Sequence, residues 1–320
     1  MLAMRIHSLG QPMTLDEVPP PAPAAGEVAL KLHSCGINFA DTLLVKGKYQ
    51  ESFELPFTPG MEVCGTVTAL GAGVTEPAVG TRVAAYAGVG GLAEQAVVPA
   101  DRCVPVPDAM SDEDAAAFLV AYGTSHVALD YKARLQKGET LLVLGASGGV
   151  GLTAVELGKL MGATVIAVAR GADKLAVAHA AGADHLIDSD TDDLRDRVKA
   201  LGGADVVYDP VGGAAFKAAL RATNPDGRIL PLGFASGEVP QIPANILLVK
   251  NITVIGYYWG GYARTRPRVL TDSFRQLFDW YAEGRLKPHV SHVLPLSRAN
   301  EALALLAERK STGKVVVKIG

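Results

Sequence analysis

The pattern of hydrophobic positions changes near residue 120. Before that point, Val28–Leu32 alternates apolar and polar residues, and Gly65–Leu70 and Thr81–Ala87 are rich in β-forming residues. Proline and glycine separate these segments, as at Pro19–Pro21 and Pro59–Gly60. Short alternating runs between turn residues are typical of half-buried strands. Residues 1–120 are therefore predicted to form a β-rich domain.

Residues 121–256 show a different pattern, in which apolar runs of strand length alternate with helical spacing. Thr140–Leu144 is continuously apolar, as expected for a strand buried on both faces of a parallel sheet. Helical spacing follows at Val150–Met161, and a second such pattern covers Lys174–Ala181. Further strand-like runs are Thr164–Ala169, His185–Ile187, Asp205–Tyr208, Arg228–Leu232 and Ile252–Gly256. The repeated alternation predicts a doubly wound parallel α/β sheet.

The remaining residues, 257–320, carry amphipathic helical patterns near Arg268–Glu283 and Arg298–Arg309 and a final β run at Lys314–Ile319. This tail is too small for a core of its own, so we expect it to complete the β-rich domain. The predicted domains are thus 1–120 together with 257–320, and 121–256 inserted between them, with a cleft between the two domains.

Composition adds limits to this picture. A length of 320 residues favours two domains over a single core. The formal net charge of −3 does not favour a nucleic-acid partner. Cys35, Cys64 and Cys103 lie far apart, which indicates a reducing compartment. Because no signal core and no long apolar run is present, we expect a soluble cytoplasmic protein without a membrane partner.

A glycine-rich turn follows the apolar run Thr140–Leu144. Its glycines stand at 145, 148, 149 and 151, with a strand pattern before them and a helical pattern after them. A pyrophosphate needs backbone N–H donors at a helix N-terminus and no side chain that would hold it away. The turn is therefore predicted to bind a dinucleotide. The expected contacts come from Ser147, Gly148, Gly149 and Val150.

The residues after the second strand of this sheet indicate which dinucleotide binds. Sheets that bind NAD place Asp or Glu there, to bond the ribose 2′-hydroxyl. Here Ala169 is followed by Arg170, and Lys174 comes one helical turn later. Both cations can pair with a 2′-phosphate, although they can also be solvated charges at a helix start. We predict NADPH.

Together with this turn, several other motifs make the chain resemble the medium-chain dehydrogenase/reductase superfamily, and within it the zinc-free NADPH:quinone oxidoreductases of the zeta-crystallin group. The motifs are Gly36–Thr42, Gly47–Tyr49, Leu55–Glu62, Ala121–Thr124, Asp209–Gly213 and Thr312–Val316. The resemblance implies a GroES-like β-rich catalytic domain and a Rossmann domain with NADPH in the cleft. It also implies a homodimer joined along the last strand of the nucleotide sheet, near Ile252–Tyr257.

The resemblance also implies site residues. Tyr49 is the expected catalytic donor, and Asn38 is expected to contact the substrate or the nicotinamide ribose. Additional cofactor contacts are implied for Asp41, Thr42, Thr124, Gly233, Phe234, Ala235, Tyr257 and Tyr258. Asn38 can alternatively cap a helix, and Tyr49 can be an ordinary loop aromatic. The aromatic cluster around Trp259 can line a substrate pocket, or it can pack the domain junction or a dimer contact.

No metal site is predicted. Zinc-dependent relatives place Cys and His where this chain has Asn38 and Met61, and an amide and a thioether are poor zinc ligands. Without a Lewis acid, reduction of an electron-poor substrate is more natural than alcohol oxidation. The predicted reaction is hydride transfer from NADPH to a quinone or another conjugated carbonyl. Two alternatives remain open: an enone or enoyl-thioester reductase, and an NADPH-binding sensor or structural protein with little catalysis.

Overall fold

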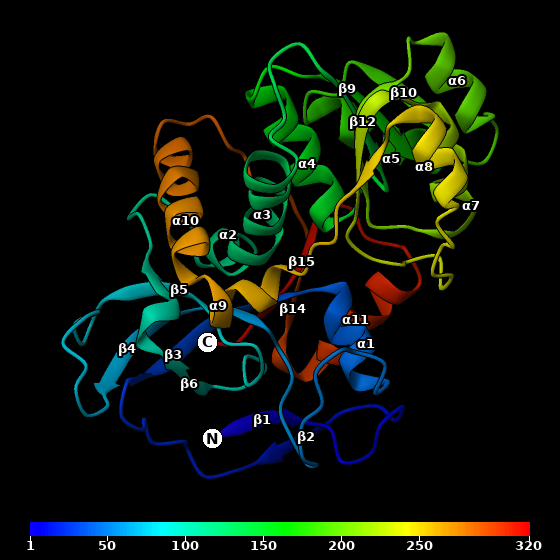
Figure 1. Ribbon diagram of the computed structural model, residues 1–320. Coiled ribbons are helices and arrows are strands. Elements are labelled where there is room, and N and C mark those ends of the chain that lie inside the picture. The colour runs from blue at the N-terminus through cyan, green and yellow to red at the C-terminus, as the bar shows by residue number, and fades with distance from the viewer. The chain divides into compact units, whose positions relative to one another are not determined.

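The computed structural model describes residues 1–320 in two compact units (Figure 1). The split unit comprises Met1–Val120 and Phe278–Gly320, and the continuous unit comprises Ala121–Leu277. The first boundary is where the sequence predicted it. The second is not, because residues 257–277 belong to the continuous unit rather than to the β-rich domain.

Aromatic packing explains the difference at the second boundary. Trp259 and Phe274 lie with their ring centroids 6.1 Å apart. Both pack against Gly123, where an added Cβ would lie 2.9 Å from the Phe274 ring and 3.1 Å from that of Trp259. Residues 257–277 therefore bury their large side chains against the rest of the continuous unit. Because this contact joins residues that are distant in sequence, the local hydrophobic pattern does not predict it.

The split unit is built on a seven-stranded sheet. Its order is β14 (Val290–Pro295), β15 (Lys314–Lys318), β3 (Glu27–Ile37), β4 (Glu62–Leu70), β5 (Arg82–Tyr86) and β7 (Cys103–Pro105), and β6 (Gln95–Pro99) also pairs with β3. A separate antiparallel pair comprises β1 (Leu2–Arg5) and β2 (Thr14–Glu17). The helices are α1 (Phe39–Val45), α2 (Asp112–Ala116) and α11 (Ala299–Ala307), with the short turns η1 (Ala100–Arg102) and η4 (Leu296–Arg298).

The C-terminal residues complete this sheet, as the sequence predicted. Strand β15 runs antiparallel to β3, and Val316 pairs with Gly36. Strand β4 pairs with β3 along Val28–Gly36, while on the other side β6 pairs with Glu27–Lys31 and β15 with Ser34–Ile37. Alternation indicated a strand only at Val28–Leu32, whereas β3 continues to Ile37 because β4 and β15 both pair with its second half.

The continuous unit is a six-stranded parallel sheet. Its order is β10 (His185–Asp188), β9 (Thr164–Ala169), β8 (Thr140–Leu144), β11 (Ala204–Asp209), β12 (Thr223–Pro231) and β13 (Thr253–Val254). The main helices are α3 (Leu119–His126), α4 (Gly149–Leu160), α5 (Ala172–Ala180), α6 (Leu194–Ala200), α7 (Gly213–Ala222) and α8 (Ala244–Lys250). The π-helical turn η2 (Val127–Lys132), η3 (Trp259–Gly261), α9 (Tyr262–Thr265) and α10 (Pro267–Ala282) complete the assignment.

Helices cover both faces of this parallel sheet, with α4 on one side of β12 and α7 and α8 on the other (Figure 1). The continuous unit thus confirms the predicted doubly wound parallel sheet. No helix anywhere in the chain has both the length and the apolar character needed to cross a membrane.

The strand order places the predicted dinucleotide site. The chain runs outward from β8 through β9 to β10, and then returns to form β11 on the other side of β8. The carboxyl ends of β8 and β11 are therefore neighbours at the point where the strand order reverses. Ligands of doubly wound sheets bind at this point.

Candidate functional site

The glycine-rich turn joins β8 to α4, as predicted. Gly145 has φ +62°, a left-handed conformation that favours glycine. A Cβ on Gly151 would lie 2.1 Å from the Gly145 carbonyl oxygen, so only glycine lets the helix begin this close to the strand. By contrast, a Cβ on Gly148 would meet only that same oxygen, at an ordinary 3.4 Å. The space over Gly148 is therefore open to a ligand.

Backbone donors line this turn. Helix α4 begins at Gly149, and the Leu152 N–H donates to the Gly148 carbonyl at 2.8 Å as the first helical bond. The N–H groups of Gly149 and Val150 belong to the first turn of α4 and have no acceptor within the helix. These donors, at the positive end of a helix dipole, are suited to a phosphate.

A buried network of hydroxyl groups contacts the first turn of α4. No local sequence pattern predicts this network. The Ser125 Oγ lies 2.8 Å from the Thr153 Oγ1 and 2.8 Å from the Tyr208 hydroxyl. The Ser125 hydroxyl also donates to the Val150 carbonyl at 2.9 Å. The network therefore joins α3, α4 and β11 and fixes the first turn of α4 in position.

The loops that follow β11 and β12 lie against each other at the same edge of the sheet. Asp209 ends β11, and its Oδ1 accepts from the N–H groups of Val211 and Gly212 at 2.7 and 2.9 Å. The Ala235 N–H, in the loop after β12, donates to the Pro210 carbonyl at 3.1 Å. A Cβ on Gly145 would lie 3.1 Å from a Val211 methyl group, so the Asp209 loop also reaches the glycine turn.

Of the three residues predicted in the loop after β12, Gly233 lies over the Pro210 carbonyl and Phe234 is exposed. Asp209 is fully buried, and its Oδ2 has no hydrogen-bond partner. Burial raises the pKa of Asp209 above its ordinary value. The loop therefore holds one unsatisfied carboxylate oxygen beside the predicted phosphate site, which the sequence did not single out.

Arg170 directly follows β9, and Lys174 lies in the first turns of α5, as the sequence predicted. Arg170 forms an exposed ion pair with Asp190, with 2.9 Å between Nε and Oδ1. Asp188, at the end of β10, accepts from the Gly171 N–H at 3.1 Å. Strand β9 itself ends without a carboxylate and is followed by Arg170, while the Asp188 and Asp190 carboxylates beside it come from β10 and the loop after it.

Thr124 and Tyr257, both predicted to contact the cofactor, are joined to each other. The Tyr257 hydroxyl donates to the Thr124 carbonyl at 3.0 Å, and burial raises the pKa of Tyr257 well above its usual value. Tyr258 lies against Gly261 at the start of η3. Trp259 is buried against Phe274 and Gly123, all three within the continuous unit.

In the split unit, Asn38 belongs to a buried network of charged and polar groups. Its side-chain N–H donates to the Glu62 Oε1 at 2.9 Å, and its side-chain oxygen accepts from the Lys314 ammonium at 2.7 Å. Lys314 and Glu62 form an ion pair with 2.5 Å between Nζ and Oε1, and both are at least 94% buried in side-chain terms. The other Glu62 oxygen accepts from the Val120 N–H at 2.9 Å.

This network fixes the orientation of the Asn38 amide, because one side faces a carboxylate and the other an ammonium. Asn38 is also the residue that precedes α1, so the capping alternative and the network coexist. Neither Glu62 nor Lys314 was a predicted site residue. Both stood within motifs that carried the family resemblance, and only the fold brings residues 252 positions apart into contact.

Asp41 and Thr42 lie on the first turn of α1, next to the network. The Asp41 carboxylate accepts from the N–H groups of Asn38 and Gly60, at 2.8 and 3.2 Å. Burial raises the pKa of Asp41 to about 7, while these hydrogen bonds and the Lys314 charge oppose the rise. The Thr42 hydroxyl donates to the Phe39 carbonyl at 2.6 Å. Both side chains are thus held by their own unit.

The residues at the expected zinc-ligand positions do not fit a zinc ion. Asn38 contacts the Lys314 ammonium, whose charge would repel a cation. Met61 is buried and offers a thioether. Cys35 is also buried, and burial raises its pKa well above the usual value, so its thiol stays protonated. The chemistry of these side chains agrees with the prediction of no catalytic zinc.

A second group of potential metal ligands lies elsewhere in the split unit, where His33, Cys64 and Asp112 converge within 4.8 Å. Asp112 is already paired there with the Arg82 guanidinium at 2.9 Å. The Cys64 thiol lies 3.4 Å from the same carboxylate oxygen, and burial raises its pKa. These groups neutralise one another and are readily explained as a structural contact.

Tyr49, the predicted catalytic donor, is half-buried in the loop after α1. Gly47 in this loop has φ +63°, and the Lys48 N–H donates to the Leu43 carbonyl at 2.8 Å. The loop is therefore anchored to α1 just before Tyr49, and Tyr49 stays a prediction as a catalytic residue.

Comparisons with known proteins identify the relatives of both units. Residues 24–108 match the alcohol dehydrogenase GroES-like domain family, and residues 149–283 match the family described as zinc-binding dehydrogenase. The chain is 42% identical to the quinone oxidoreductase-like protein 2 homolog of Nematostella vectensis, over 98% of this chain and 88% of that protein.

Solved structures show the same relationship. The quinone oxidoreductase of Escherichia coli complexed with NADPH is 30% identical, with a TM-score of 0.92 over 99% of this chain and 100% of that one. The quinone oxidoreductase of Thermus thermophilus, also solved in complex with NADPH, is 34% identical, with a TM-score of 0.88 over 99% and 100% of the two chains. The chain therefore belongs to the quinone oxidoreductase family of the medium-chain dehydrogenase/reductase superfamily.

Proposed function

We propose that this protein is a zinc-independent, NADPH-dependent reductase that transfers hydride to a quinone or to another electron-poor conjugated carbonyl. One observation carries the proposal: the Lys314 ammonium donates to Asn38. Asn38 occupies the sequence position at which zinc-dependent relatives have a metal ligand. Without a Lewis acid, oxidation of an alcohol lacks its usual activation. A substrate that is already electron-poor needs no such activation.

The continuous unit supplies the groups for NADPH. The N–H groups of Gly149 and Val150 face the phosphates, and Arg170 with Lys174 binds the 2′-phosphate. The exposed Arg170–Asp190 ion pair is a weak competitor, because such pairs contribute only about 0–1 kcal/mol. When bound, NADPH supplies the hydride at nicotinamide C4.

The split unit supplies a donor for the substrate. Reduction places negative charge on a carbonyl oxygen, and a donor positioned in advance stabilises that charge. We assign this role to the Tyr49 hydroxyl. Asn38 contributes differently, because its amide already bonds Glu62 and Lys314 and thus has a fixed orientation toward any ligand.

Turnover with three substrate classes tests the proposal. NADPH oxidation is measured with 1,4-benzoquinone, with a simple enone and with crotonyl-CoA, at equal concentrations. We expect turnover with the quinone. Turnover with crotonyl-CoA and none with quinones would establish the enoyl-thioester reductase alternative. NADPH binding without oxidation by any substrate would establish the sensor alternative.

The variant Tyr49→Phe tests whether the Tyr49 hydroxyl donates a hydrogen bond to the substrate, because it removes only that hydroxyl. Loss of the hydroxyl should lower kcat for the quinone, because the hydrogen bond forms as charge develops. Tyr131→Phe, which removes the hydroxyl from an exposed tyrosine of the continuous unit, is the matched control. An unchanged kcat in Tyr49→Phe would leave Tyr49 with a packing role.

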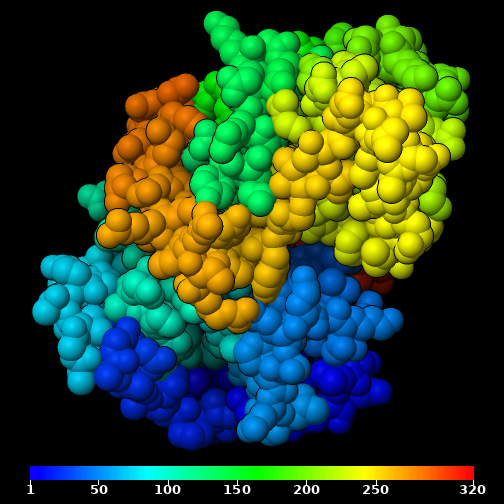
Figure 2. Space-filling view, in the orientation of Figure 1, coloured from blue at the N-terminus to red at the C-terminus, as the bar shows by residue number.

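We also propose that two copies associate through the edge of the parallel sheet. Strand β13 is the edge strand and pairs with β12 alone. The preceding helix α8, which lies at the surface in yellow in Figure 2, exposes 77% of Leu248. An open strand edge beside exposed apolar residues favours a partner. Leu248→Asp should shift the mass measured by light scattering from dimer to monomer, and a monomeric parent protein would contradict the proposal.

A further inference from the structure

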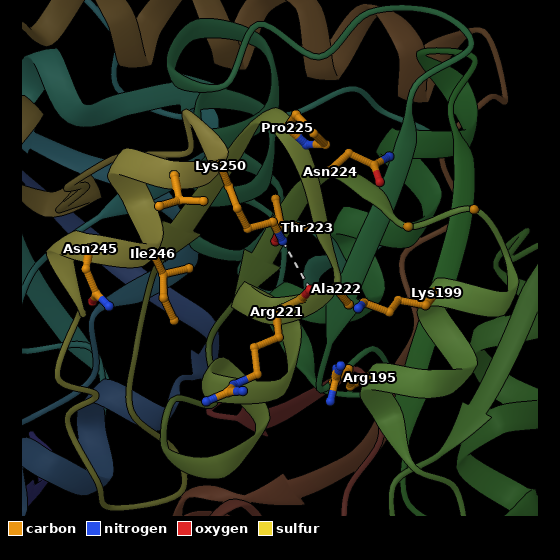
Figure 3. A pocket seen from close by; sticks show the side chains of 13 residues that line it. Arg195, Lys199, Arg221, Ala222, Thr223, Asn224, Pro225, Asn245, Ile246 and Lys250 are labelled. Carbon is orange, nitrogen blue, oxygen red and sulfur yellow. Dashed lines mark hydrogen bonds between the residues drawn. The ribbon is translucent and has the colours of Figure 1, made fainter.

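A basic pocket lies in the continuous unit, away from the predicted cofactor edge. It has a volume of about 730 Å³ and is lined by α6, the end of α7, the start of β12, and α8. Figure 3 shows Arg195 and Lys199 entering from one side, Asn245, Ile246 and Lys250 from the other, and Arg221 between them. We call this hollow the basic pocket.

The sheet topology separates this pocket from the glycine turn. The turn at Gly145 and the loops at Asp209 and Gly233 follow the carboxyl ends of β8, β11 and β12. The basic pocket is lined instead by Gly203, just before β11, and by Thr223, the first residue of β12. In a parallel sheet the amino ends of all strands lie at one edge, opposite the carboxyl ends. The pocket is therefore a second site and not part of the first.

The charges around the pocket are uncompensated. Arg195, Lys199 and Arg221 are exposed and form no ion pair. Lys250 is half-buried, and its ammonium donates to the carbonyls of Leu220 and Arg221 at 3.3 and 3.1 Å, at the end of α7. The second of these bonds is the dashed line in Figure 3.

Neighbouring groups do not supply the missing negative charge. Burial lowers the pKa of Lys250, and the positive charges of Lys199 and Arg195 lower it further. The amide of the lining residue Asn224 donates to Asp205 at 2.9 Å, and the same carboxylate accepts from the Thr140 N–H at 2.8 Å. The Asp205 carboxylate is thus engaged with Asn224 and the sheet.

We propose that the basic pocket binds a small metabolite that carries two or more phosphate groups. Arginine presents a planar fork of donors that matches phosphate oxygens, and two arginines flank the pocket. Several cations around one hollow favour several anionic groups on one ligand over a single carboxylate. The volume lies within the range of small-molecule sites, roughly 300–1,000 Å³. This site is independent of the reductase proposal and adds to it.

Inorganic tripolyphosphate is the probe, and isothermal titration at constant ionic strength is the measurement. The titration is performed on the full chain with and without saturating NADPH. Binding should be the same in both, because the site lies at the opposite edge of the sheet. Displacement of tripolyphosphate by NADPH would assign the binding to the cofactor site and overturn the proposal.

Variants locate the binding site. Lys199→Gln combined with Arg221→Gln should weaken tripolyphosphate roughly tenfold or more, because each removes a charge-assisted hydrogen bond. Both side chains are exposed, so the fold should tolerate the changes. Lys137→Gln is the matched control: an exposed lysine just before β8, at the same edge but outside the pocket. Equal affinity in the double variant and the parent would overturn the proposal.

A last experiment tests whether the basic pocket binds a nucleic acid instead of a small phosphorylated metabolite. A short single-stranded RNA is titrated into the parent and the Lys199→Gln/Arg221→Gln variant under the same conditions. The proposal expects weak RNA binding that the double variant does not change. RNA that binds more tightly than tripolyphosphate, and loses affinity in the double variant, would replace the small metabolite with a nucleic acid. Absence of tripolyphosphate binding at millimolar concentration would also overturn the proposal.

Discussion

The glycine turn of the continuous unit and the charged network of the split unit use polar groups in opposite ways. At the turn, the N–H groups of Gly149 and Val150 have no partner in their helix and are available to a ligand. In the network, Asn38, Glu62 and Lys314 satisfy one another and are buried. The first arrangement leaves donors free of partners in their helix, and the second uses its polar groups within the fold.

The largest effect is expected from breaking the network. Lys314→Met leaves the Glu62 carboxylate buried without its counter-charge, which should cost about 3–5 kcal/mol in the free energy of unfolding measured with denaturant. Lys318→Met, on the same strand, removes only an exposed ion pair with Glu113 and should cost under about 1 kcal/mol. Adding Glu62→Gln to Lys314→Met should restore part of the loss, because the remaining partner is then neutral. Equal losses in the two lysine variants would refute the structural role.

Asp41 gives the network a pH dependence of defined sign. Its pKa is about 7 in the folded chain and 3.8 in the reference state, so the folded chain keeps the proton while the unfolded chain releases it. Stability should therefore fall as pH rises from 4 toward 7, by at most about 1.4 kcal/mol per pH unit from this group, and then level off. The check is denaturant unfolding at several pH values. In Asp41→Asn this part of the slope should disappear, whereas a slope identical to the parent's would contradict the assignment.

Three glycine variants distinguish packing from ligand approach at the turn. Gly151→Ala forces a Cβ against the Gly145 carbonyl and should lower stability by about 1–3 kcal/mol. Gly148→Ala makes only an ordinary contact, so the melting temperature should stay near the parent's while NADPH affinity drops. Gly256→Ala, which meets no atom within 4 Å, should change neither. If Gly148→Ala bound NADPH as tightly as the parent, the phosphates of NADPH would not bind over Gly148.

The smallest effect concerns the choice of cofactor. Arg170→Ala with Lys174→Ala should weaken NADPH about tenfold or more, with little change for NADH, because only NADPH carries the 2′-phosphate. Dissociation constants from fluorescence titration give the ratio. Asp190→Asn frees Arg170 from its ion pair and should strengthen NADPH slightly. If the double variant bound NADPH and NADH more weakly by the same factor, Arg170 and Lys174 would not be the residues that bind the 2′-phosphate.

The sequence was informative where structure is local. Thr140–Leu144 is a strand and the glycines follow it because a buried strand and a tight turn need those residues at adjacent positions. The Ser125 network and the Glu62–Lys314 pair could not be predicted, since each joins residues from separate elements. The boundary near residue 257 was placed too early for the same reason, because Trp259 packs against residues distant in sequence.

The position of β15 has a consequence for biosynthesis. The strand that carries Lys314 is translated after the whole continuous unit, yet it pairs with β3 near the start of the chain. The continuous unit can fold as one uninterrupted segment while translation proceeds. The ion pair between Lys314 and Glu62 needs both β4 and β15, so it forms only after β15 has been translated. Strand β15, made after both β3 and the continuous unit, therefore completes the sheet that contains β3.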